Sequence, residues 1–157
     1  YRKLAEGLIG VGLLKGTAED AVASGALYLF MPHGLGHGLG MDVHDCEAFG
    51  ERSFDFSSIA ERAAKSATCI YRAAWRVQPG TILSDEPGIY FIPALIDKSR
   101  AEGLYRGIVD YDRLESYRDF GGIRIEDDLL VTEEGCRMLG DKRIPVTAEE
   151  LEEVVGR

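Results

Sequence analysis

The sequence predicts an α+β domain, in which helical and strand-like segments follow one another along the chain. Two β-prone runs within residues 81–92 are broken by Pro-Gly, and residues 123–131 lead into a Glu-Glu-Gly turn typical of a hairpin. Helical patterns precede and follow these runs. We find no repeat or low-complexity linker, and 157 residues suffice for a sizeable core, so residues 1–157 are read as one unit.

The first part of the chain has helical periodicity. Apolar residues in 1–15 predict an amphipathic helix that stops near Gly16. Thr17, followed by an acidic turn, is an expected N-cap for a short helix to about Ser24. The apolar run 27–31 is expected to be a strand.

The remaining segments alternate between connections and regular structure. Residues 46–57 have loop-like composition, and residues 58–76 are expected to be helical. A turn is expected at 78–80, and residues 93–120 read as a polar connection with a helix near 112–118. A last helix is expected to begin at a Thr147 cap.

Composition restricts the classes of partner. The formal net charge of −9 argues against binding to nucleic acid or to an anionic membrane, and no apolar run is long enough to span a bilayer. Cys46, Cys69 and Cys136 form no CxxC pair, which favours a reducing, cytoplasmic setting. Cys46 is either a nucleophile near His44 or, as we favour, a small buried side chain.

All three histidines, His33, His37 and His44, lie within the glycine-rich residues 30–45. Three satisfied polar side chains near a turn would be the simpler interpretation, but their clustering is typical of metal and catalytic sites. His33 and His37 have the spacing of a helical zinc motif. The intervening Gly-Leu-Gly supplies neither a helix nor a general base, so irregular or extended backbone is expected.

Two glutamates stand in strand-like surroundings. Glu86 follows an apolar run, and Glu126 shares a strand face with Arg124 by alternation. A solvated ion pair would explain the second strand alone, but buried charges need pairing or a metal. One His and two Glu form a mixed nitrogen and oxygen ligand set, which suits Mn²⁺, Co²⁺ or Zn²⁺.

Three motifs occur in one order. They are His-Gly-Leu-Gly-His-Gly-Leu-Gly-Met-Asp-Val-His-Asp at 33–45, Asp-Glu-Pro-Gly-Ile-Tyr-Phe at 85–91, and Gly-Gly-Ile-Arg-Ile-Glu-Asp-Asp at 121–128. The chain closely resembles the C-terminal half of the catalytic domain of Xaa-Pro dipeptidases (prolidases) and aminopeptidase P, metallopeptidases of the pita-bread fold. The resemblance implies a curved antiparallel sheet covered by helices. Residues 90–97 and 117–124 favour the prolidase branch.

The resemblance also implies a ligand set and a cofactor. His37 matches a metal-ligating His, Glu86 a ligand that is also the general-base candidate, and Glu126 a carboxylate that bridges two metals. Two divalent ions are implied, with Mn²⁺ as the first choice and Co²⁺ or Zn²⁺ as alternatives.

Other matched residues are expected to handle the peptide substrate. His33 and His44 resemble the histidines that contact substrate and stabilise the intermediate, and Arg124 matches the Arg beside the bridging Glu. Arg72 lies fourteen residues before Glu86, where prolidases place an Arg that binds the carboxylate of the dipeptide.

One part of the family's pattern has no match in residues 1–157. The two metal-ligating aspartates lie upstream in the family, as does its N-terminal domain, so the site of this chain is expected to be incomplete and the chain by itself inactive. Asp85 stands where relatives usually carry an apolar residue. One carboxylate among Asp85, Glu86 and Glu126 is expected to have a raised pKa.

The expected activity of the full-length parent is hydrolysis of the bond before proline in Xaa-Pro dipeptides, by a homodimer. The alternatives are an aminopeptidase P that takes longer peptides and a metal-free pita-bread module that binds or acts as a scaffold. Retention of His37, Glu86 and Glu126 argues against the metal-free module.

Overall fold

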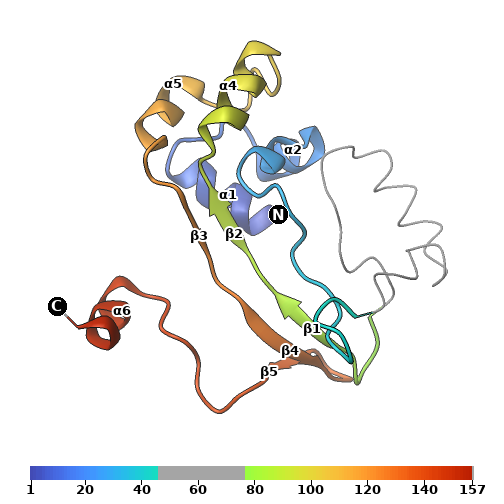
Figure 1. Cartoon of the computed structure of the whole chain (residues 1–157). Coiled ribbons are helices and arrows are strands. Elements are labelled where there is room, and N and C mark those ends of the chain that lie inside the picture. The colour runs from blue at the N-terminus through green and yellow to red at the C-terminus, as the bar shows by residue number, and fades with distance from the viewer. Residues whose placement is uncertain (46–76, 157) are drawn as a thin grey trace.

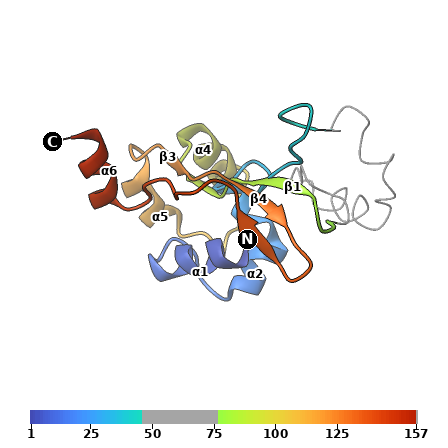
Figure 2. The same cartoon turned by 90° about the horizontal axis from the view of Figure 1, so that it is seen from below.

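The computed structural model describes residues 1–45 and 77–156. Figure 1 shows a group of helices at one end of a long strand ribbon, with the last helix standing apart. Figure 2 shows α1 and α2 together on one side of that ribbon. Within the described residues, no helix combines the length and the apolar composition that crossing a membrane would require. The helix expected at 58–76 lies outside the described residues.

The chain starts with two helices, α1 (Arg2–Gly10) and α2 (Ala18–Ser24). The Oγ1 atom of Thr17 accepts a hydrogen bond from the backbone N–H of Asp20 at 3.1 Å, which confirms the expected N-cap. Gly25 ends α2 with a φ of 77°, a left-handed conformation that suits glycine. The first helix is shorter than expected, because the chain leaves it after Gly10 to bury Leu13 and Leu14.

The prediction of a strand at residues 27–31 is wrong. Residues Ala26–Leu29 form a 3₁₀ helix, η1, in which Ala26, Leu27 and Leu29 are all buried. A short apolar run that is buried on several sides has the same sequence signal whether it is helical or extended. The surrounding helices, rather than the local sequence, therefore decided its conformation.

Two antiparallel ladders build the ribbon. In one ladder β1 (Ile82–Asp85) pairs with β4 (Asp127–Val131), and β4 pairs with β5 (Cys136–Met138) through the expected hairpin. In the other, β2 (Gly88–Tyr90) pairs with β3 (Gly122–Arg124). The turn before β1 also forms as expected, with Thr81 N–H donating to Gln78 O at 3.1 Å.

The single strand expected at 123–131 is interrupted at Ile125 and Glu126. The same register holds on both sides of the interruption, so Glu86 lies opposite Glu126 and Pro87 opposite Ile125. Proline has no N–H to donate to a ladder, although its carbonyl still accepts from Ile125 N–H at 3.1 Å. Two carboxylates therefore face each other where the ladder breaks.

The connection 93–120 contains more helix than expected. Helix α4 (Pro93–Ala101) begins with a proline at its first turn, where the missing N–H does no harm, and buries Ile96. The helix expected near 112–118 is found as α5 (Tyr111–Leu114) followed by the 3₁₀ helix η4 (Glu115–Tyr117). The sequence signal for α4 is Pro93 followed by helix-forming residues.

The last helix, α6 (Ala148–Val155), begins at the expected Thr147 cap and has a full capping box with Glu150. It buries no residue, and it stands apart in both views (Figures 1 and 2). The apolar core lies instead at the helical end. Its buried members come from α1, α2, η1, α4, α5 and the segments that join them, and include Leu8, Leu13, Leu27, Leu29, Phe30, Phe91, Ile96 and Leu114.

Candidate metal centre

Residues 30–45, which we call the His–Gly segment, have irregular backbone, and residues 35–39 run beside β1 and Glu86. Ser84 N–H donates to His37 O at 2.9 Å, and Glu86 N–H donates to Leu35 O at 2.7 Å. Gly36 allows this approach, because a Cβ built on it would lie 1.9 Å from the carbonyl oxygen of Ser84. The helical zinc motif is therefore excluded for His33 and His37, as the sequence indicated.

The side chains of His37, Glu86 and Glu126 converge at the break in the ladder. One donor atom from each lies within 4.8 Å of the others. His37 and Glu86 are buried, whereas Glu126 is exposed. The Nε2 atom of His37 lies 3.1 Å from Oε1 of Glu86. One imidazole nitrogen and two carboxylates, at this mutual separation, fit a divalent cation, although three donors are fewer than two ions need.

Arg124 joins the two carboxylates through hydrogen bonds. Its two terminal nitrogens each donate at 2.7 Å, one to Oε2 of Glu86 and the other to Oε2 of Glu126. Gly88, its cross-strand neighbour, has no side chain on the partner strand to compete for this space. The guanidinium supplies positive charge beside a buried carboxylate that would otherwise be costly to desolvate.

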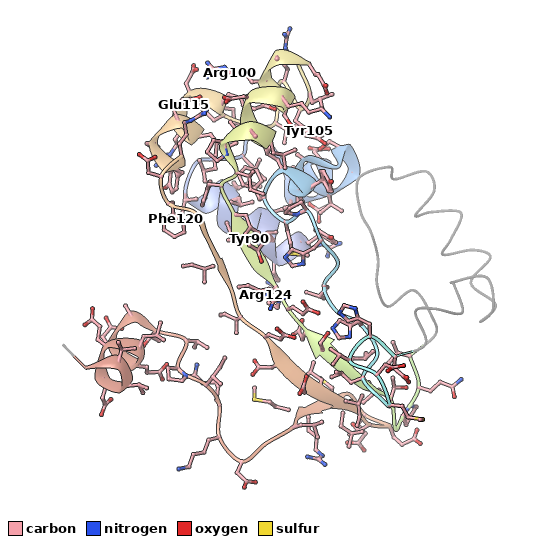
Figure 3. The ribbon with its side chains drawn as sticks, viewed as in Figure 1. Tyr90, Arg100, Tyr105, Glu115, Phe120 and Arg124 are labelled. Atoms are coloured by element: carbon pink, nitrogen blue, oxygen red, sulfur yellow. The ribbon has the colours of Figure 1, made fainter. Side chains whose placement is uncertain are left out.

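His44 joins this group, and His33 lies beside Tyr90. The ring of His44 is 4.2 Å from that of His37, centroid to centroid, in an edge-to-face arrangement. The ring of His33 lies 5.3 Å from that of Tyr90, which is labelled in Figure 3. The Nε2 atom of His33 is buried, with no hydrogen-bond partner in the described part of the chain. A buried imidazole nitrogen of this kind is available to a ligand.

The raised pKa occurs at Asp85, but its cause differs from the one expected. Burial first, and then the charge of Asp127, raise the pKa of Asp85 above its ordinary value. Asp127 is the cross-strand partner of Asp85 in the ladder. Strand alternation directs Asp85 to the face opposite that of Ser84 and Glu86. The repulsion between Asp85 and Asp127 therefore acts on the opposite face of the strand from His37 and Glu86, and not among the three proposed ligands.

Sequence reasoning missed Ser84. Its Oγ donates to Oε1 of Glu86 at 2.9 Å and accepts from the backbone N–H of His37 at 3.0 Å. The available signal was its position two residues before Glu86 in a strand, which puts both side chains on one face. Arg72, expected to bind substrate, and Cys46 and Cys69 lie outside the described residues.

Comparison with known proteins agrees with this arrangement. The family model for metallopeptidase family M24 matches residues 9–133. The human Xaa-Pro dipeptidase is 39% identical over 147 residues, covering 94% of this chain and 28% of its own length. A probable Xaa-Pro aminopeptidase of Metarhizium robertsii is 36% identical over 156 residues, covering 85% of this chain and 30% of its own length. The chain thus spans less than a third of the length of these relatives.

Solved structures give the same relationship. Pseudomonas aeruginosa aminopeptidase PepP superposes with a TM-score of 0.54 at 31% identity, covering 88% of this chain and 23% of that one. Escherichia coli aminopeptidase P with the inhibitor Pro-Leu gives a TM-score of 0.51, also at 31% identity and with the same coverage. The expected fold, an α+β portion of a pita-bread domain with an antiparallel sheet and helices, is confirmed. The chain belongs to metallopeptidase family M24.

Proposed function

We propose that the full-length protein is a metal-dependent peptidase that hydrolyses the bond before proline in Xaa-Pro dipeptides. The observation that carries this proposal is the convergence of His37, Glu86 and Glu126, with Arg124 joining the two carboxylates. The dipeptidase and aminopeptidase relatives support the substrate class.

In this proposal His37, Glu86 and Glu126 hold two divalent ions together with ligands supplied by the rest of the protein. The mixed imidazole and carboxylate ligands suit Mn²⁺, Co²⁺ or Zn²⁺, and the family resemblance makes Mn²⁺ the first choice. Ions bound there would supply an activated water and polarise the scissile carbonyl. The chain by itself, with three such donors among its described residues, is proposed to be inactive.

The remaining roles fall to side chains of this chain. Glu86 would accept the proton of the attacking water as general base. His44, packed against His37, would donate a hydrogen bond to the carbonyl oxygen as negative charge develops on it. His33, with its buried and unpartnered Nε2, would bind the peptide. Arg124 would keep the two carboxylates in place.

The direct test is peptidase activity with Xaa-Pro dipeptides and Mn²⁺, measured on the full-length protein and on the 157-residue chain. We expect turnover by the full-length protein alone. Comparable turnover by both would mean that the ligand set has been misidentified. A full-length protein that neither binds a divalent ion nor cleaves the peptide would favour the metal-free binding module.

The second candidate is an aminopeptidase P that acts on longer peptides, which is favoured by the solved structures of that enzyme. We propose that Arg72 selects dipeptides by pairing with their terminal carboxylate through its planar fork. Arg72→Ala should then raise the KM for Xaa-Pro dipeptides more than it lowers kcat, and should affect longer peptides less. An unchanged KM for dipeptides would point to the aminopeptidase.

We also propose that the full-length protein is a homodimer in the cytoplasm. The family resemblance supports the dimer, and the absence of a CxxC pair supports a reducing compartment. Light scattering of the purified full-length protein tests the first proposal, and fractionation of its native cells tests the second.

A further inference from the structure

We propose that Ser84 is a positioning residue that sets the distance and orientation between His37 and Glu86. The inference rests on the proposed metal site and adds to it a residue that does not itself ligate. Ser84 is only 5% exposed, and its hydroxyl forms a hydrogen bond with each of these two residues.

The contacts of Ser84 join two separate elements. Its Oγ accepts from His37 N–H at 3.0 Å, and its own N–H donates to His37 O at 2.9 Å. Serine 84 belongs to β1, whereas His37 belongs to the His–Gly segment, 47 positions earlier. Backbone bonds on either side, from Glu86 N–H to Leu35 O at 2.7 Å and from Leu39 N–H to Ile82 O at 3.1 Å, hold the two elements together. The Ser84 hydroxyl adds the side-chain contact to His37, and it therefore helps to fix the position of His37 along β1.

The same hydroxyl fixes the carboxylate of Glu86. It donates to Oε1 at 2.9 Å, while Arg124 donates to Oε2 at 2.7 Å, so each oxygen has its own donor. A hydroxyl whose lone pair is occupied by His37 N–H directs its single proton toward Glu86. Loss of the hydroxyl would leave the buried N–H of His37 without this partner, and Oε1 of Glu86 would keep only its 3.1 Å contact with Nε2 of His37.

This arrangement separates two roles for the serine. If Ser84 only satisfied backbone groups of a strand, its loss would lower stability and leave ion affinity unchanged. If it positions the ligands, its loss should weaken ion binding even where the fold survives. Outer-shell hydrogen-bond partners of ligands are typically worth roughly 10- to 100-fold in metal affinity.

The test is a matched pair in the full-length protein, Ser84→Thr and Ser84→Val. Both variants have the same shape and suit a strand, and they differ in the hydroxyl. Affinity for Mn²⁺ is measured by calorimetry without substrate. We expect Ser84→Thr to bind within a few-fold of wild type and Ser84→Val to bind about 10- to 100-fold more weakly. Ser99→Ala serves as control, because Ser99 is equally buried but lies in α4.

Equal affinities for the Thr and Val variants would overturn the inference, as would an equal loss of affinity in Ser99→Ala. A wild-type protein that binds no Mn²⁺, Co²⁺ or Zn²⁺ would overturn the proposed function itself. A wild-type protein that binds the ion, with Ser84→Val binding equally well, would overturn only the role of Ser84.

Discussion

The helical end and the strand ribbon of this protein bury different kinds of side chain. At the helical end (α1, α2, η1, α4 and α5) the buried residues are almost all apolar, as at Leu8, Leu27 and Leu114. In the ribbon and the adjoining His–Gly segment beyond Met31, the buried side chains are His37, Ser84 and Glu86. Figure 3 shows Tyr90 and Arg124 along the ribbon, away from the helices that carry Arg100 and Glu115.

The difference indicates that stability and chemistry are assigned to separate ends. Apolar burial supplies the main favourable free energy of folding, and it is concentrated among the helices. Buried polar groups contribute little net stability and are tolerated where each has a partner. We therefore expect substitutions at the two ends to have separable effects on unfolding and on metal binding.

The largest effect on stability is expected from Leu114→Ala, which truncates a fully buried side chain in α5. Loss of transfer free energy plus a residual cavity should lower the free energy of unfolding by about 2–5 kcal/mol. Denaturant titration measures this loss. Leu104→Ala, at a side chain that is 40% exposed, is the control and should have a much smaller effect. A weakened Mn²⁺ affinity in folded Leu114→Ala would contradict the separation of the two ends.

Glu86→Gln should weaken metal binding more than it lowers stability, the opposite of Leu114→Ala. It keeps the shape but removes the charge that His37, Ser84 and Arg124 surround. Metal affinity should fall by at least the roughly 10- to 100-fold that an outer-shell partner is worth. Unfolding without metal should change less than in Leu114→Ala, because Arg124 is 44% exposed and keeps Glu126.

Glu134→Gln, at an exposed position in the β4–β5 turn, controls for the general loss of one negative charge. If Glu86→Gln binds Mn²⁺ as tightly as this control does, Glu86 is not a ligand.

A smaller effect is expected at Thr147, outside both ends. Thr147→Ala removes the N-cap of α6 and should lower the stability of that helix by about 1 kcal/mol. Because α6 buries no residue, the loss should appear as faster amide exchange within α6 and not in the global unfolding transition. Thr147→Ser keeps the cap, so the amides of α6 in this variant should exchange as slowly as in wild type. A shift of the global transition would mean that α6 is coupled to the helical end.

The smallest effect on stability is expected from Asp110→Asn at the helical end. The contact with Lys15 at 2.8 Å, together with the hydrogen bond from Arg113 N–H, lowers the pKa of Asp110 below its ordinary value of 3.8. A carboxyl with a lowered folded pKa stabilises the protein fully above its ordinary pKa of 3.8, and this contribution is lost as the pH falls from 3.8 through the folded pKa. Wild type should therefore be slightly more stable than Asp110→Asn at pH 7.

Asn retains the acceptor for Arg113 N–H, so the cap is matched and only the charge differs. Denaturant titrations at several pH values should show the two proteins converging below pH 3.8. A difference that persists in acid would assign the effect to the cap and not to the charge.

The sequence by itself determined the local features whose signals are short-range. Thr17 and Thr147 cap helices because a side-chain oxygen reaches an N–H three residues on. Alternation and turn residues specified β1, β2 and the β4–β5 hairpin. Motif order specified the family, and it selected His37, Glu86 and Glu126 from the 27 acidic residues and three histidines.

Only the tertiary structure decided how these residues meet. Helical burial on several sides made 26–29 a 3₁₀ helix, although its composition suits a strand. Pairing with a proline-containing strand broke 123–131 at Glu126 and set that carboxylate opposite Glu86. Ser84 acquired its role because the His–Gly segment, distant in sequence, lies against β1. Such long-range contacts depend on register and packing between segments, which no local sequence pattern encodes.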